Sequence, residues 1–181
     1  MDLPTLAENL ELPQGYRTEV IDGSIVVSPT PTYRHAWIVK RIERAIDRAQ
    51  AMDRAGLQMV TVEISTTGDR YVPDLVVLPE SLAMGQGWEG PDWIRPAEEL
   101  ELAVEVVSPS TSVRDWQVKP RGHARAGVPL YLVVDPAKGE LALFSNPKGS
   151  EYRDVARALR DESVKLPEPF GIEIAVNSLL P

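Results

Sequence analysis

The pattern of apolar and polar residues along the chain predicts short strands separated by a few helices. Residues 16–21 and 24–28 alternate in polarity on either side of Asp22-Gly23, which predicts a β-hairpin with a two-residue turn. Apolar residues recur at helical spacing between Thr32 and about Asp53. We therefore expect an amphipathic helix there, with Thr32 as its N-cap.

The second half of the chain is dominated by buried strands. Residues 57–65 alternate as a strand, and apolar runs over residues 71–78, 100–107 and 130–134 predict three more. A turn at residues 135–139 leads into a strand over residues 140–145, and the tail after Glu151 predicts two weaker strands around residues 167–169. A helix is expected to start near residues 108–111 and to end at Gly127.

This order of elements predicts one mixed β-sheet with helices packed against it, an α/β or α+β fold. No linker, repeat or low-complexity tract interrupts the chain, so we expect a single domain over residues 1–181. Residues 79–99 are rich in glycine and proline and contain Trp88 and Trp93, which predicts a long loop. Such a loop is a plausible contact surface for a homodimer.

Composition narrows the chemistry. The chain has 181 residues, no cysteine and only two histidines, His35 and His123, which argues against a thiolate or imidazole zinc site. Any metal would be held by oxygen, which favours Mg²⁺ or Mn²⁺. The sequence shows no signal peptide and no membrane-spanning stretch, so a cytoplasmic protein is expected.

The formal net charge of −8 argues against a general nucleic-acid binder, because such proteins are usually basic. An acidic chain can still bind nucleic acid through a local basic patch or a metal. The arginines of the helix over residues 34–53 are candidates for such a patch. Acidic residues lie between them, however, and that mixture is also typical of an ordinary solvated face.

Two carboxylates stand out because they interrupt the apolar strands. Asp74 lies in the run over residues 71–78 and Glu105 in the run over residues 100–107. A buried carboxylate is costly unless it is paired or binds a metal. The strand pleat points Glu105 away from its two apolar neighbours, towards a position where Asp74 can meet it. With the Val106 backbone carbonyl and Lys119, these residues suggest a one-metal phosphodiesterase site. The simpler alternative is a pair of acids on a wet strand face.

The chain also resembles the Uma-two family, in a set of blocks that occur in the same order over residues 16–145. These blocks are residues 19–23, residues 28–31 with His35, residues 73–77, residues 105–111, Asp115, Lys119, residues 126–131 and Asp135-Pro136. That family is assigned to the restriction-endonuclease-like PD-(D/E)XK superfamily, whose core is a mixed sheet flanked by helices. No single block is decisive, but the ordered set is specific.

The resemblance implies that Asp74 and Glu105 are metal ligands in a Mg²⁺-dependent attack of water on a phosphodiester. The chain departs from the superfamily pattern at one position. Two residues after Glu105, where the pattern has a lysine, this chain has Val107. The Uma-two pattern places a lysine on the next helix instead, here Lys119, which the following proline puts near a helix start. An exposed lysine is the alternative.

Three weaker candidates surround this trio. Glu19 matches the first acid of the family and is a candidate accessory carboxylate, although a hairpin acid is more often on the surface. His35 is a candidate for contacting phosphate or carrying a proton, although such a residue more often caps or packs. Asp115 is placed to pair with Lys119 across one helical turn or to favour the helix start.

The sequence therefore predicts a metal-dependent endonuclease that acts on nucleic acid, on DNA rather than RNA. Two alternatives stay open. One is a catalytically inactive interaction module of the same fold, which the net acidity and Val107 favour. The other is a hydrolase of a small phosphodiester, which an acidic surface suits better than long DNA.

Overall fold

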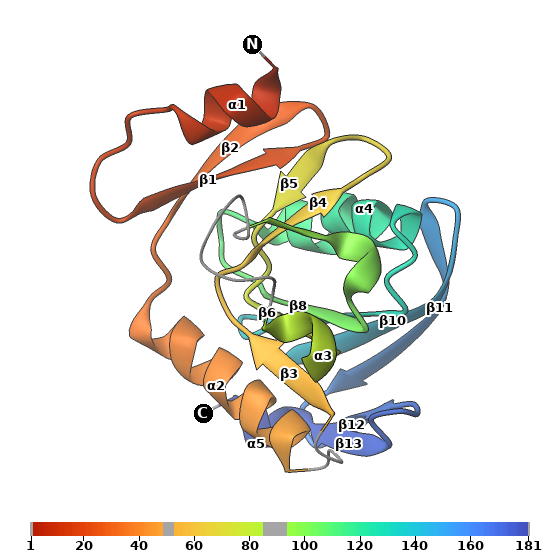
Figure 1. Ribbon diagram of the computed structural model, residues 1–181. Coiled ribbons are helices and arrows are strands. Elements are labelled where there is room, and N and C mark those ends of the chain that lie inside the picture. Colours follow the sequence, from red (N-terminus) through yellow and green to blue (C-terminus); the bar gives the residue numbers. More distant parts are fainter. Residues whose placement is uncertain (1, 49–52, 85–93, 181) are drawn as a thin grey trace.

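A computed structural model describes residues 2–48, 53–84 and 94–180, and its strands form two larger sheets and a small hairpin (Figure 1). The larger sheet has six strands in the order β11-β10-β9-β8-β6-β3. They are β3 (Arg54–Leu57), β6 (Leu75–Pro79), β8 (Leu102–Val106), β9 (Leu130–Asp135), β10 (Glu140–Lys148) and β11 (Glu151–Leu159). Strands β8 and β9 are parallel, while the other neighbours in this sheet are antiparallel.

A helical crossover joins the two parallel strands, as parallel pairing requires. It consists of a π-helical turn (Arg114–Val118) that continues into α4 (Lys119–Arg125). Gly127, with φ +74°, ends the crossover in the left-handed region that favours glycine. The predicted end of this helix at Gly127 is therefore confirmed.

The second sheet has five strands in the order β2-β1-β5-β4-β7. They are β1 (Tyr16–Ile21), β2 (Ser24–Pro29), β4 (Thr61–Ile64), β5 (Asp69–Tyr71) and β7 (Ile94–Pro96). The predicted hairpin is confirmed, because Ile21 pairs with Ser24 and both Asp22 and Gly23 have positive φ. The short helix α1 (Leu3–Glu8) lies over this sheet at the N-terminal end of the molecule (Figure 1).

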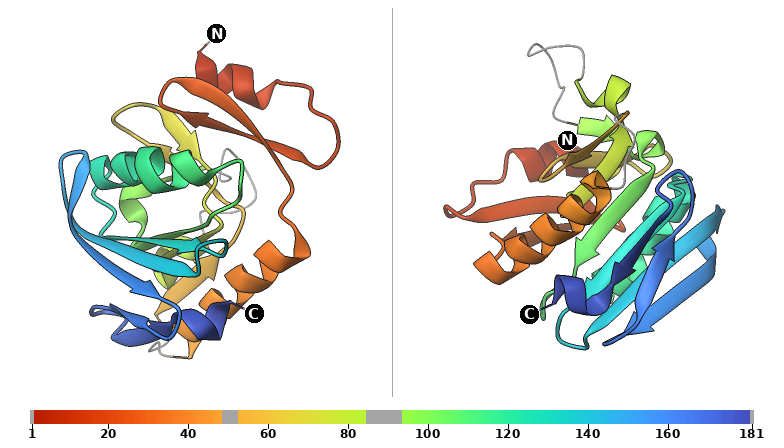
Figure 2. Two further views of the ribbon diagram at one scale, coloured as in Figure 1. Left: turned by 180° about the vertical axis from the view of Figure 1, so that it is seen from behind. Right: turned by 90° about the horizontal axis from the view of Figure 1, so that it is seen from below.

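The remaining elements cover the opposite end of the molecule. The hairpin of β12 (Ser163–Leu166) and β13 (Ile172–Ala175) leads into the one-turn helix α5 (Val176–Leu179). Helix α2 (Tyr33–Asp47) lies beside these C-terminal elements in both views of Figure 2. Two further single turns, α3 (Glu80–Ala83) and a 3₁₀ turn (Ala97–Glu99), lie beside β3 and β4. Among the described residues, no helix is both long and apolar enough to span a bilayer.

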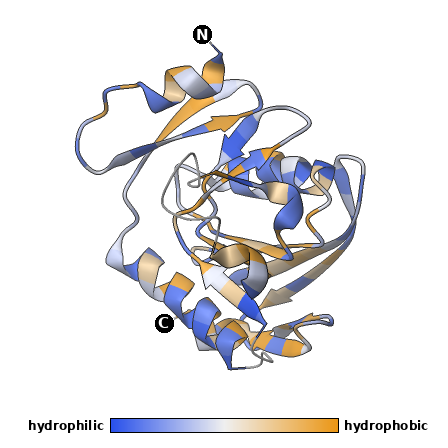
Figure 3. Ribbon diagram, viewed as in Figure 1, coloured by the Kyte–Doolittle hydropathy of each residue, from blue (hydrophilic) through white to orange (hydrophobic). Residues whose placement is uncertain are grey.

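The six-stranded sheet has a separate apolar core on each face. Val104 and Val106 of β8 pack in one core with Ile42 of α2, whereas Ala103 packs in the other with Tyr131 of β9. Figure 3 shows the central strands in orange and α2 in both colours, as expected for an amphipathic helix. Burying each large apolar side chain contributes roughly 1.5–3 kcal/mol. The predicted parity of β8 is confirmed, and Glu105 lies on the side of Ala103.

The α+β fold class is confirmed, but the prediction of one mixed sheet is wrong. The strand predicted over residues 57–65 is divided between β3 and β4, which belong to different sheets. Met59 adopts φ +59° between them, and such a left-handed residue ends an extended strand. The run over residues 71–78 is likewise divided into β5 and β6, because Pro73 has no N–H to donate to a ladder.

Two other predictions are corrected in part. The long helix ends at Asp47 rather than near Asp53, and residues 49–52 lie outside the described residues. Part of the predicted loop over residues 79–99 is regular, since it contains α3, β7 and the 3₁₀ turn. Trp88 and Trp93 lie outside the described residues, so a homodimer contact through this loop stays a prediction.

Close packing of α4 on β5 yields a stability prediction. A Cβ atom on Gly122 would lie 2.2 Å from Tyr71 Oη and 2.6 Å from Tyr71 Cε2, and the Tyr71 ring is fully buried. Helix propensity alone favours alanine by up to about 1 kcal/mol, but overpacking a core typically costs about 1–3 kcal/mol. We expect Gly122→Ala to lower the free energy of unfolding by roughly 1–2 kcal/mol in urea titrations.

A matched control for this substitution is Gly56→Ala in β3. The nearest side-chain atom to its added Cβ is Leu75 Cδ1 at 3.4 Å, and the backbone has ordinary φ. This variant should unfold at the same urea concentration as the parent or slightly above it. A Gly122→Ala protein as stable as the parent would contradict the steric argument.

Candidate functional site

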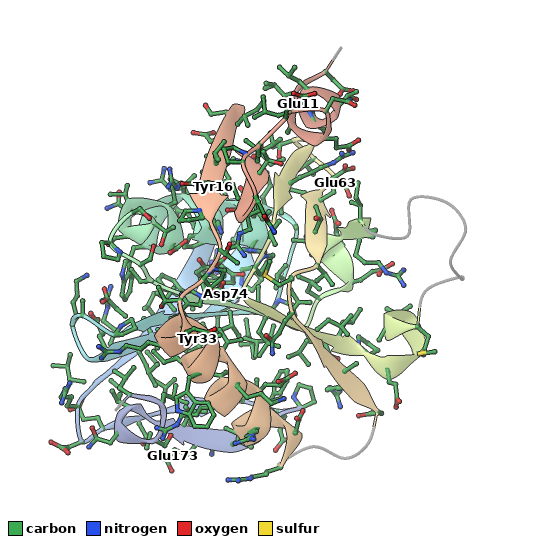
Figure 4. All side chains as sticks on the ribbon, turned by 90° about the vertical axis from the view of Figure 1, so that its left-hand side faces the viewer. Glu11, Tyr16, Tyr33, Glu63, Asp74 and Glu173 are labelled. Carbon is green, nitrogen blue, oxygen red and sulfur yellow. The ribbon has the colours of Figure 1, made fainter. Side chains whose placement is uncertain are left out.

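A cavity of about 450 Å³ lies between the hairpin β1–β2, the start of α2 and the end of β8. Four acidic side chains line it: Glu19, Asp74, Glu105 and Asp115. All four residues are at most 5% exposed. Figure 4 shows Asp74 at the centre of this face of the molecule, between the labelled Tyr16 and Tyr33.

One ammonium group joins three of these carboxylates. Lys119 Nζ lies 2.7 Å from Glu105 Oε1, 2.9 Å from Glu19 Oε1 and 3.8 Å from Asp115 Oδ1. The lysine is 2% exposed, although it is the first residue of α4. The structure therefore brings Lys119 to Glu105, and the interpretation of an exposed lysine is wrong.

Asp74 has a different set of partners. Its Oδ1 lies 2.9 Å from His35 Nε2 and 3.7 Å from Arg17 Nη2, while its Oδ2 accepts a hydrogen bond of 2.8 Å from the Val106 N–H. Asp74 lies just before β6, where its own N–H donates to the carbonyl of Val104. These two backbone bonds fix Asp74 against β8, the strand that carries Glu105.

Glu19 is a buried residue of this cluster and not the surface acid that hairpins usually carry. It is 3% exposed, and its Oε1 accepts a hydrogen bond of 2.8 Å from the Val72 N–H as well as contacting Lys119. The Val72 bond ties β1 to the segment that precedes Asp74. Glu19 therefore positions both Lys119 and the approach to β6.

Burial and charge shift the pKa values of Lys119 and Glu105. Burial by itself disfavours the charged ammonium, but Glu105, Glu19 and Asp115 outweigh it and raise the pKa of Lys119. Lys119 thus stays protonated throughout the neutral range. Burial raises the pKa of Glu105 well above its usual range, against the opposing influence of Lys119, and the neighbouring carboxylates raise it further.

The other two acids respond in opposite directions. Burial raises the pKa of Asp115 to about 6, although Lys119 and a hydrogen bond from Thr111 oppose that change. Burial by itself would also raise the pKa of Asp74, but the contacts with His35, the Val106 N–H and Arg17 outweigh it and lower this pKa. Asp74 therefore loses its proton more readily than a free aspartic acid, whereas Glu105 and Asp115 bind protons more tightly than they would in water.

The fixed charges of this cluster do not balance. Two fixed cations, Lys119 and Arg17, lie within 4.0 Å of the four carboxylates, so full ionisation of the acids would leave two more negative than positive charges in this buried cluster. Arg34 also lines the cavity, but it is exposed and pairs with none of the four acids. Within the described part of the chain, the buried Asp115 Oδ1 also has no hydrogen-bond partner. A protein interior disfavours unpaired charge, so this site favours protons or a further cation.

The donor set fits a hard divalent cation. Carboxylate and carbonyl oxygens suit Mg²⁺ or Mn²⁺, and Mg²⁺ is usually held by one or two carboxylates with several retained waters. Among the described residues, no group of three or more histidine or acidic side chains is placed to hold a metal ion by itself. Asp74 and Glu105 with the backbone carbonyl of Val106 suit such a partly hydrated ion.

The structure also shows which residues the sequence reasoning missed. Arg17 was not predicted, although it lies two residues before Glu19 and therefore faces the same side of β1. Val107 is partly buried, packs against the apolar core and also lines the cavity, and Lys119 supplies the ammonium that the superfamily pattern expects at position 107. His123 is not in the cavity, because its ring packs against Tyr71 and Tyr131, where burial lowers its pKa to about 3.

Comparison with known proteins identifies related sequences and a related structure. The sequence model of the Uma2 family, described as "Putative restriction endonuclease", matches residues 6–177. A crystal structure of a protein from Anabaena variabilis, titled a putative nuclease belonging to DUF820, superimposes with a TM-score of 0.73 at 17% identity. The match covers 99% of this chain and 97% of that one, so the two share a fold. A search of curated proteins finds no match.

The raised pKa of Asp115 yields a prediction about stability and pH. The folded chain holds this proton more tightly than the unfolded chain, so stability falls as pH rises from 3.8 through about 6. The difference between these two pKa values corresponds to about 3 kcal/mol. This is the largest increase in the free energy of unfolding that a neutral side chain at position 115 can give. In EDTA, Asp115→Asn should raise the free energy of unfolding by up to about 3 kcal/mol at pH 7.5 and about half as much at pH 5.

Urea titrations at the two pH values measure this effect. Asp47→Asn is the control, because Asp47 is an exposed acid on α2 and should change stability little at either pH. A destabilised Asp115→Asn protein at pH 7.5 would contradict the assignment of Asp115 as a costly buried charge.

Proposed function

Because the chain belongs to the Uma2 family, we propose that it is a metal-dependent nuclease that hydrolyses phosphodiester bonds of nucleic acid in the Asp74–Glu105 cavity. The observation that carries this proposal is the charge imbalance of the cavity. Four buried carboxylates have only two fixed cations within 4.0 Å among the described residues, and a bound divalent cation would neutralise the excess. A purely structural ion-pair cluster has no need of this surplus.

Asp74, Glu105 and the backbone carbonyl of Val106 would hold the cation, Mg²⁺ or Mn²⁺. When bound, such an ion supplies polarisation of the scissile phosphate and a lowered pKa for an attacking water. His35 and Arg17 contact the same Oδ1 of Asp74 that faces the cavity. A cation held by Asp74 would compete with these contacts, so the imidazole of His35 and the guanidinium of Arg17 would then be available to face the substrate.

The chain's own residues have distinct roles in this proposal. Lys119 keeps its proton at neutral pH, so it acts by stabilising negative charge on the phosphate and not as a base. Glu19 and Asp115 fix its ammonium in place. His35 is the proton carrier, because an imidazole beside the cavity can take a proton from water or give one to a leaving oxygen.

Two alternatives compete with this proposal. A catalytically inactive module of the same fold was favoured by Val107, but Lys119 supplies the missing ammonium at 2.7 Å from Glu105. A hydrolase of a small phosphodiester is supported by the modest cavity of about 450 Å³. Both alternatives are tested together with the main proposal below.

Metal binding is tested by thermal unfolding. If the cation binds with a dissociation constant near 1 mM, 10 mM Mn²⁺ stabilises the fold by about 1.4 kcal/mol, or about 3–6 °C in melting temperature. The increase should be larger at pH 8 than at pH 6, because a ligand that holds a proton must release it to bind metal. Asp74→Asn should abolish the increase.

Asp69→Asn is the matched control for Asp74→Asn. Asp69 is also 5% exposed, but it accepts a hydrogen bond from Gly23 and does not line the cavity. This variant should keep the full increase in melting temperature with Mn²⁺. Equal increases in Asp74→Asn and the parent would place the metal elsewhere.

Catalysis is tested with supercoiled plasmid, single-stranded DNA, RNA and bis(p-nitrophenyl) phosphate, each with Mn²⁺ or EDTA. We expect metal-dependent cleavage that falls by about 100-fold or more in Glu105→Gln. Glu101→Gln should retain full activity, because Glu101 pairs with Arg54 outside the cavity. Metal binding without cleavage of any substrate would favour the inactive module, and cleavage of the small ester alone would favour the small-substrate hydrolase.

A further inference from the structure

Helix α2 has one apolar and one cationic side. Its apolar side, with Ile38, Val39, Ile42 and Ile46, packs in the core. Its other side bears six residues within about 100° of the helix circumference: Tyr33, Trp37, Lys40, Arg41, Arg44 and Arg48. We call these six residues the α2 outer face. Residues 33–48 carry five basic and two acidic side chains, a balance of +3 in a chain whose net charge is −8.

Two large aromatic side chains are exposed on this face. Tyr33 is 98% exposed and Trp37 is 48% exposed. They lie one helical turn apart, about 6 Å along the helix axis. The guanidinium carbons of Arg41 and Arg44 lie 5.6 and 5.7 Å from the centre of the Trp37 ring, so the indole is held among cations. Core packing does not account for aromatic rings this exposed.

Several cations of the helix are available to a ligand. Within residues 2–48, 53–84 and 94–180, no carboxylate lies within 4.0 Å of the guanidinium of Arg34, Arg44 or Arg48. The intervening acid Glu43 is already paired, since its Oε2 lies 2.7 Å from Lys40 Nζ and accepts from the Gln58 amide. The acids within α2 therefore leave most of its positive charge uncompensated.

The α2 outer face is continuous with the cavity. The first turn of the helix supplies Arg34 and His35 to the cavity wall, and Tyr33 lies between Arg34 and the wall residue Thr32. A chain bound along α2 would thus lead directly to the carboxylates.

We propose that the α2 outer face is a platform for single-stranded nucleic acid, which stacks bases on Trp37 and Tyr33 and passes into the cavity. This inference rests on the proposed nuclease function and names the form of its substrate. Arginines bind the phosphates, and exposed aromatic rings stack on unpaired bases. In a duplex the bases are stacked on one another, so its phosphates can contact the arginines but its bases cannot stack on Trp37 and Tyr33.

Fluorescence anisotropy in EDTA tests this proposal, since it measures binding without cleavage. A labelled single-stranded oligonucleotide should bind the parent protein more tightly than the duplex of the same sequence does. Trp37→Ala and Tyr33→Ala should each weaken single-strand binding by about 5- to 150-fold. Trp37→Phe keeps a stacking ring and should lose less affinity than Trp37→Ala.

A salt titration separates stacking from phosphate binding. Arg44→Ala should reduce the slope of log K against log salt by about 0.7, as expected for one lost phosphate contact on a single strand. Arg153→Ala is the matched control, because Arg153 is also exposed but lies on β11, away from α2 in Figure 1, and should leave the slope unchanged. Circular dichroism checks that each variant is folded.

The outcomes separate this inference from the proposed function. Unchanged affinity in both aromatic variants, equal binding of duplex and single strand, or no binding by the parent protein would each overturn the platform. Loss of cleavage in Mn²⁺ together with intact, ring-dependent binding in EDTA would instead overturn the nuclease assignment and leave the platform standing.

Discussion

The buried ammonium of Lys119 is the interaction on which the rest of the site depends. It joins Glu19 of β1, Glu105 of β8 and Asp115 of the π-helical turn, and these elements belong to different layers of the fold. Removing the ammonium itself would typically cost about 3–5 kcal/mol, because it would leave buried carboxylates without compensation. Gly122, about one turn after Lys119, lets the helix that carries this ammonium pack closely on the Tyr71 ring of β5.

The same cluster explains why structure and chemistry are coupled in this protein. A site with more acids than cations is stable only if it binds protons or a metal, and burial raises the pKa values of Glu105 and Asp115 accordingly. Asp74 is excluded from this trend because a backbone N–H, His35 and Arg17 hold its charge. The proposed cation would therefore bind among the same groups that hold the walls of the cavity together.

The sequence predicted the local features of this site better than its surroundings. The hairpin at Asp22-Gly23, the parity of β8 and the buried strand β9 follow from periodicity and turn chemistry, which are local. The division into separate sheets depends on strand pairing between distant residues, and the one local sign in the sequence was Pro73, since the left-handed conformation of Met59 is visible only in the structure. The burial of Glu19 was not predictable either, because it requires β1 to lie across Lys119.

The acidity of the chain does not oppose binding of a polyanion, because charge in this protein is segregated. Along the sequence of α2 the acids alternate with arginines and suggest a neutral wet face, but in space Glu43 turns to Lys40 and Gln58. At physiological salt the Debye length is about 8 Å, so exposed acids on distant elements contribute little to the field at Arg34 or Arg44. A phosphate near α2 therefore responds to the local balance of +3 and not to the total of −8.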